Sequence, residues 1–267
     1  MTQKWVEMGD IDIKVEKSPP IGWLVFDRPE KMNAMHAGMW GALPDKIREL
    51  EEDPAVRVIV FRGAGEQAFS AGADIAEFHE HGTSSTADAL AGIREDAFRA
   101  IAECRKPTVG MIHGFCMGGG CAIALNLDIR IASEDAVFAI TPARLGLGYP
   151  HSGIQRAVAE LGPAATRYLF LTANKVNAHQ AERMGLVQEV HPANELEGAT
   201  ETLALRIAGN APKTIRAVRA SVHHILSPGD GDTGAVETLI AECAGSEDFQ
   251  EGLRAFVEKR PPEFRDA

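Results

Sequence analysis

A run of three consecutive glycines, Gly118-Gly119-Gly120, constrains the fold more than any other feature of the sequence. The apolar segment 106–117 leads into it, and a short apolar stretch at 121–125 continues beyond it. Each glycine loses more conformational freedom on folding than alanine would, so such a run is costly unless the backbone must be closely approached. Where a strand turns into a helix, unpaired N–H groups point outward and the helix dipole favours negative charge. The pattern therefore predicts a strand–turn–helix unit that can bind an anion.

An earlier part of the chain repeats this pattern. The β-branched apolar run 56–63 is followed by the small residues of 69–75. One exposed N–H group from each turn, aimed at a single point, would form an oxyanion hole. Each turn alone is explained as a tight connection between packed elements. The pair, in this order, favours a functional site.

The residues of these two turns carry a family resemblance. Segments 69–75 (FSAGADI) and 113–121 (HGFCMGGGC) resemble the enoyl-CoA hydratase/isomerase (crotonase) superfamily, and the likeness extends through 27–34 and 251–260. It covers nearly the whole chain in order. It is specific for the superfamily and much less specific for the reaction.

The resemblance implies an α/β fold with two parts. Residues 1–206 would form a crotonase-like spiral of ββα units that stack into two roughly perpendicular sheets. Residues 207–267 would form a C-terminal helical trimerisation region, and the protein would assemble as a homotrimer or homohexamer. Three amphipathic stripes, at 215–225, 236–243 and 249–257, agree with this region, although helices that pack only on their own domain would show the same pattern.

The resemblance also implies an acyl-CoA thioester substrate and no cofactor beyond its coenzyme A moiety. The N–H groups of Ala73 and Gly119 would hold the thioester oxygen and stabilise an enolate. The coenzyme A path would be bordered by four residues: Lys31, Ala71, Asp74 and Ile75. For Lys31, a solvated loop lysine is an equally good explanation.

Both glutamates that act as general acid and base in enoyl-CoA hydratases are replaced here. By position, these residues are Ala122 and Ala143. A positioned acid or base typically contributes about 10²–10⁴-fold to a reaction rate. Hydration by the usual route is therefore disfavoured, and decarboxylation or another non-hydratase reaction is slightly favoured.

The loop 144–153 offers two other candidate catalytic residues. It resembles the corresponding loop of methylmalonyl-CoA decarboxylase, in which a tyrosine at the position of Tyr149 helps orient the substrate carboxylate. That enzyme has a histidine where this chain has Ala73, so the match is partial. A buried structural tyrosine is an equally good explanation. His151 could supply acid–base chemistry for a hydratase or isomerase, or be a solvated turn residue.

Other histidines and the cysteines suggest no metal site. His113 lies in an apolar strand, where a satisfied core histidine is the commoner role. The four cysteines show no CxxC pairing, form no ligand spacing with the nine histidines, and are expected to be small buried apolar residues. We therefore predict no bound metal.

Charge and hydropathy narrow the possible partners. With 27 basic and 38 acidic side chains the net charge is −11, which argues against nucleic-acid binding. Coenzyme A would then need a local cluster of cations and backbone amides. No apolar run could span a bilayer and no leader is evident, so a cytoplasmic protein without a membrane partner is expected. A catalytically silent acyl-CoA-binding protein remains an alternative to the enzyme.

Local patterns predict several further elements. Residues 11–17 and 21–26 should form a β-hairpin. Residues 35–50 carry a helical apolar stripe that Pro44 should kink or split. The polar segment 77–86 is predicted to be a mobile loop over the site, and its histidines, His79 and His81, would face either the ligand or water.

Overall fold

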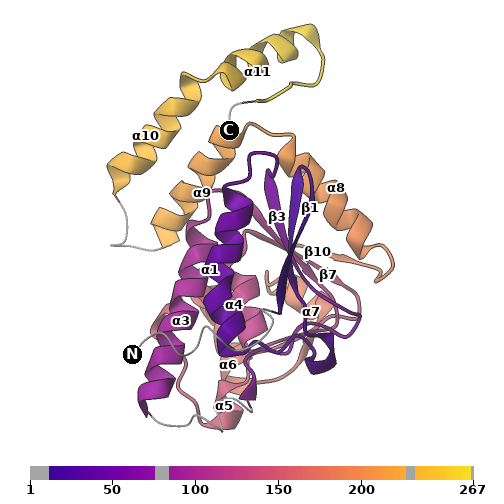
Figure 1. Cartoon of the computed structure of the whole chain (residues 1–267), viewed down its shortest axis with the longest axis vertical. Coiled ribbons are helices and arrows are strands. Elements are labelled where there is room, and N and C mark those ends of the chain that lie inside the picture. Colours follow the sequence, from indigo (N-terminus) through magenta and orange to yellow (C-terminus); the bar gives the residue numbers. More distant parts are fainter. Residues whose placement is uncertain (1–11, 76–83, 227–231, 266–267) are drawn as a thin grey trace.

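The structure is a computed structural model that describes residues 12–75, 84–226 and 232–265. The described residues form two sheets, and strands of the larger one are labelled in Figure 1. The larger sheet has the strand order β1 (Ile13–Ser18), β2 (Ile21–Phe26), β3 (Val58–Gly63), β5 (Thr108–Ile112), β7 (Ile129–Ser133), β10 (Glu189–His191). The smaller sheet has the order β4 (Ala68–Ser70), β6 (Phe115–Met117), β8 (Val137–Ala139), β9 (Val176–Asn177).

Successive strand pairs pass from the larger sheet to the smaller one. The strands β3, β5 and β7 lie side by side and parallel, and their successors β4, β6 and β8 are parallel neighbours in the other sheet. The hairpin of β1 and β2 is antiparallel, as the alternation of the sequence predicts. This arrangement is the spiral of ββα units that the family resemblance implies.

The helices cover both faces of the larger sheet (Figure 1). Their bounds are η1 (Pro29–Lys31), α1 (Ala37–Glu51), α3 (Ser84–Glu103), α4 (Gly119–Asn126), α5 (Pro142–Leu145), α6 (His151–Thr172), α7 (Ala178–Arg183), α8 (Leu196–Ala208), α9 (Pro212–Leu226), α10 (Thr233–Ala244), α11 (Glu247–Glu258). Pro44 lies inside one continuous α1, so the predicted split of this helix is wrong.

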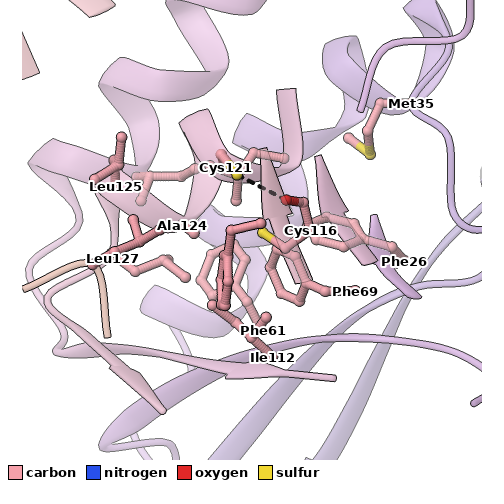
Figure 2. Close-up of a cluster of buried hydrophobic side chains, with 14 of the residues drawn as sticks. Phe26, Met35, Phe61, Phe69, Ile112, Cys116, Cys121, Ala124, Leu125 and Leu127 are labelled. Carbon is pink, nitrogen blue, oxygen red and sulfur yellow. Dashed lines mark hydrogen bonds between the residues drawn. The ribbon is translucent and has the colours of Figure 1, made fainter. Parts of the chain in front are cut away.

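Two hydrophobic cores flank the larger sheet because its strands are covered on both faces. On β3, Phe61 belongs to the core between the two sheets and α1, whereas Val60 belongs to the core beneath α8. Figure 2 shows the first core, in which Cys121 at the start of α4 donates its thiol hydrogen to the carbonyl oxygen of Cys116, at 2.8 Å. Three of the four cysteines are buried free thiols, as predicted, and Cys243 is half-buried. Packing of α4 into this core fixes the position of the glycine run.

The C-terminal helices leave their apolar stripes exposed. Ile225 on α9 is 70% exposed, and Phe256 and Val257 on α11 are 85% and 79% exposed. Figure 1 shows α10 and α11 extending away from the sheets. The predicted boundary after residue 206 falls within α8, whose inner face packs on the larger sheet.

Part of the predicted mobile loop 77–86, with His79 and His81, lies outside the described residues. Of the helices that the structure describes, none combines the length and apolar character needed to cross a membrane. The cytoplasmic location stays a prediction.

Candidate active site

The glycine run forms the predicted turn between β6 and α4. Gly118 caps α4 with φ 48° and ψ −108°, a conformation that side-chain-bearing residues rarely adopt. Its N–H group donates to the carbonyl oxygen of Ala139 at 2.8 Å, which fixes the turn to β8. Gly119 is the first residue of α4, and its N–H group donates to no acceptor in the described ranges. The positive end of the helix is therefore available to a ligand.

The segment 71–74, after β4, also has one backbone N–H group without an acceptor among the described residues. The N–H group of Ala71 donates to the oxygen of Met32 at 2.8 Å, and that of Asp74 to the oxygen of Met35 at 3.0 Å. The N–H group of Gly72 donates to the side-chain Oγ of Ser70. Within 71–74, only the Ala73 amide has no acceptor among the described residues.

The two turns touch where these amides lie. A Cβ atom placed on Gly119 would be 3.3 Å from the Ala73 nitrogen and 3.1 Å from the ring of Trp40 on α1. A Cβ atom placed on Gly72 would be 3.1 Å from the Gly119 nitrogen and 2.7 Å from the oxygen of Met117. The structure thus brings together the two residues that the sequence singles out. Glycines at positions 72 and 119 permit this approach.

Side chains from the 28–35 loop hold the second turn, and sequence reasoning missed them. Asn33, fully buried with φ 54°, donates from Nδ2 to the oxygens of Ala64 and Ala68 at 3.0 and 2.7 Å. Its own carbonyl oxygen accepts from Ser70 Oγ at 2.8 Å. An asparagine that adopts left-handed φ can satisfy such a turn at lower cost than most residues. The only sequence signal was the short match of 27–34 to the family.

The residues predicted to border coenzyme A lie on these same loops. Asp74 forms an ion pair with Arg28, from Nη1 to Oδ2 at 2.7 Å, so its carboxylate faces the 28–35 loop. Ile75 is 54% exposed, and Ala71 is half-buried. Lys31 is exposed on η1, on a segment that borders a cavity of about 260 Å³ between 29–33 and 64–68.

The two alanines predicted to stand at the positions of the hydratase glutamates have different surroundings. Ala122 is buried in the first turns of α4, whereas Ala143 is exposed on α5. Neither can act as an acid or base.

Tyr149 lies against the first core. Its ring meets Phe170 edge-on, with centroids 4.8 Å apart, and its edge fills the space that a side chain at Gly153 would occupy. The hydroxyl makes no hydrogen bond to the residues that the structure describes. Burial, and to a smaller extent the nearby Cys121 thiol, raises the pKa of Tyr149, so it is a neutral donor.

Of the two other candidate histidines, His151 lies at the surface and His113 is partly buried. His151 is exposed at the first position of α6, next to Ser152, whose Oγ donates to Glu95 on α3 at 3.2 Å. His113 is partly buried, and burial lowers its pKa. Its Nε2 atom is buried without a hydrogen-bond partner among the described residues, so the ring is only partly satisfied. In the ranges described, no three His, Cys, Asp or Glu residues form a metal-binding group.

The chain is similar to known proteins over most of its length. The sequence model described as enoyl-CoA hydratase/isomerase matches residues 16–267. The chain is 31% identical over 254 residues to a crotonyl-CoA hydratase from Syntrophomonas wolfei, covering 95% of this chain and 97% of that protein. It is 32% identical over 251 residues to a short-chain-enoyl-CoA hydratase from Clostridium acetobutylicum, covering 93% and 95%.

A solved structure extends the likeness to the fold. The crystal structure of an enoyl-CoA hydratase/isomerase family protein from Hyphomonas neptunium superimposes with a TM-score of 0.90 at 33% identity, covering 95% of this chain and 97% of that one. The chain therefore belongs to the enoyl-CoA hydratase/isomerase family.

Proposed function

We propose that this protein is an acyl-CoA enzyme that stabilises a thioester enolate between the backbone amides of Ala73 and Gly119. The observation that carries the proposal is the meeting of these two amides, one from each turn, with no protein acceptor among the described residues. A thioester oxygen placed between them would accept two hydrogen bonds. Each such donor contributes about 2.7–4 kcal/mol to stabilising the transition state.

Among reactions that pass through this enolate, decarboxylation needs the fewest further groups. The bond from the α-carbon to the carboxylate breaks, CO₂ leaves, and the electron pair moves into the thioester, whose oxygen becomes negative. The α-carbon then takes a proton from solvent. No base is required, which suits a site with alanine at positions 122 and 143. The neutral Tyr149 hydroxyl is available as a donor to the departing carboxylate.

Hydration is the second candidate, and the names of the relatives favour it. Both curated relatives described above are hydratases. In this chain, a substitute acid or base would have to replace the two absent glutamates, and His151 is the candidate. Its exposure on α6 places it within reach of solvent protons.

The exposed stripes of α9 and α11 support assembly as a homotrimer or a dimer of trimers. Residues such as Val222, Ile225 and Phe256 would then be covered by a neighbouring copy. Apolar patches of this kind on a single chain commonly mark interaction surfaces.

A substrate panel tests the proposed function. Purified protein is offered crotonyl-CoA, methylmalonyl-CoA and ethylmalonyl-CoA, while thioester absorbance and CO₂ release are followed. CO₂ release from a malonyl-type thioester supports the proposal. Rapid hydration of crotonyl-CoA would favour the second candidate. Tight coenzyme A binding without turnover of any substrate would instead indicate a non-catalytic binding protein.

A further inference from the structure

The segment that carries the Ala73 amide is held by an ion pair as well as by its backbone. Arg28 Nη1 lies 2.7 Å from Asp74 Oδ2, and the two side chains are only 19% and 18% exposed. The two residues are 46 positions apart in the sequence. A mostly buried pair of this kind has little freedom to exchange partners, because an unpaired buried charge is strongly unfavourable.

The arginine end of this pair is itself fixed. Arg28 Nη1 also donates to the oxygen of Ala34 at 3.2 Å, and the Arg28 backbone N–H donates to Oδ1 of Asn33 at 2.9 Å. Its Nε atom lies 3.8 Å from carboxylate oxygens of Asp12 and Glu30. The guanidinium is therefore oriented by several groups at once.

The aspartate end adjoins the candidate donor directly. The backbone of Asp74 donates to Met35, and Met35 in turn donates to the oxygen of Gly72 at 2.7 Å. Ala73 is thus bracketed by two peptide groups bound to Met35, with its own N–H directed to the other side of the segment. The ion pair adds a side-chain anchor to one end of this bracket.

We propose that Arg28 and Asp74 form a positioning pair that fixes the direction of the Ala73 amide, a role that rests on the proposed function of that amide. The pair acts on the donor through the backbone, because the Asp74 carboxylate is engaged by Arg28. Aiming a donor correctly matters because small misplacements at a reacting centre cost roughly tenfold to hundredfold in rate.

The test uses a ligand that reports on the donors without turnover. The probe is 4-aminocinnamoyl-CoA, a conjugated thioester whose absorption moves to longer wavelength when its carbonyl oxygen accepts hydrogen bonds. We expect Asp74→Asn to reduce this shift for the bound probe, measured with the protein in saturating excess so that a change in affinity does not enter the result. Asp45→Asn is the matched control, because Asp45 makes an equally short ion pair with Arg48, at 2.7 Å, on the exposed side of α1.

A double variant tests whether Arg28 and Asp74 act through one shared contact or independently of each other. If Arg28 and Asp74 act through one contact, Arg28→Gln combined with Asp74→Asn should lose no more of the shift than either single change. Should Asp74→Asn fail to fold, Arg28→Lys, which keeps the charge and loses the forked geometry, is measured in the same way and is expected to show the reduced shift.

Two results would overturn the proposal, and they are distinguishable. A full shift in the folded variants, or additive losses in the double variant, refutes the positioning role alone. Absence of any shift with the unaltered protein, although the probe binds, refutes the proposed donor function and the positioning role with it.

Discussion

The two turns that meet at the candidate site produce the same kind of free amide by different means. The turn at Gly118 uses backbone alone, with a left-handed φ and the Gly119 amide, which has no acceptor within the described part of the chain. The turn at Ala73 uses side chains, because Ser70, Asn33 and the Arg28–Asp74 pair bind the groups around it. Both turns are therefore sensitive to added atoms, because Gly72 in the second turn also has a left-handed φ of 94°. The second turn is in addition sensitive to lost hydrogen bonds.

The largest expected effect comes from adding one methyl group to the backbone turn. Gly119→Ala would place a Cβ atom 3.3 Å from the Ala73 nitrogen and against Trp40. This atom would crowd the space between the two amides, where the thioester oxygen is proposed to lie. We expect turnover to fall by about 10²–10³-fold, as for loss of one oxyanion donor. The control is Gly92→Ala on α3, where a Cβ atom would meet nothing within 4 Å. Steady-state kinetics showing equal activity for both variants would contradict this assignment.

At the turn that contains Ala73, removing a side chain that holds the turn should lower the stability of the protein. Asn33→Ala leaves the oxygens of Ala64 and Ala68 and the N–H of Arg28 without their partner. Since each lost bond costs about 0.5–1.5 kcal/mol, we expect the free energy of unfolding to drop by about 3 kcal/mol. Denaturant unfolding measures this change, with the exposed Asn174→Ala as control. A change below about 1 kcal/mol, no more than a single bond typically contributes, would mean that the turn is stable without the Asn33 side chain.

The hydroxyl of Tyr149 is a candidate hydrogen-bond donor outside both turns, and its removal can be compared with the two changes above. Tyr149→Phe removes a hydroxyl that makes no described hydrogen bond, so the melting temperature should change little. Turnover should fall by about tenfold, in line with one hydrogen bond to a charged group. Because burial raises the pKa of Tyr149, its neutral form persists past the usual tyrosine range, and no activity limb from it is expected below about pH 10. A large loss of stability with activity intact would identify a structural tyrosine instead.

The smallest effect is expected at the edge of the 28–35 loop. Lys31→Ala removes an exposed cation that makes no described ion pair. If it contacts a coenzyme A phosphate, affinity should weaken by about threefold, and the loss should fade as salt is raised. Calorimetry at two salt concentrations measures this. An unchanged Kd at low salt would show that Lys31 is only a solvated residue.

Much of the fold could be predicted because its signals are local. The hairpin of β1 and β2, the glycine turn and the three C-terminal helices follow from spacing within short windows. The capping box at the start of α7, in which Asn177 and Gln180 exchange hydrogen bonds, is another such signal and spans only four residues. The continuity of α1 through Pro44 could not be foreseen, because packing of the helix outweighs the one backbone hydrogen bond that proline removes.

The candidate site was predicted only in part. The meeting of Ala73 and Gly119 followed from the family resemblance, whereas the network that holds Ala73 was missed. Its long-range contacts join residues that lie 31 to 46 positions apart, such as Asn33 with Ala64 and Arg28 with Asp74. No periodicity or short motif encodes such distances, so only the assembled chain reveals them.

The contact between Gly72 and Gly119 has a consequence for exchanging parts between related proteins. Because a side chain at either glycine would run into the backbone of the other turn, neither loop can be transplanted as an independent module. In a chimaera, an imported loop would have to fit against the native shape of the other loop. Grafts of this centre should therefore move both loops together, along with the segment that braces them.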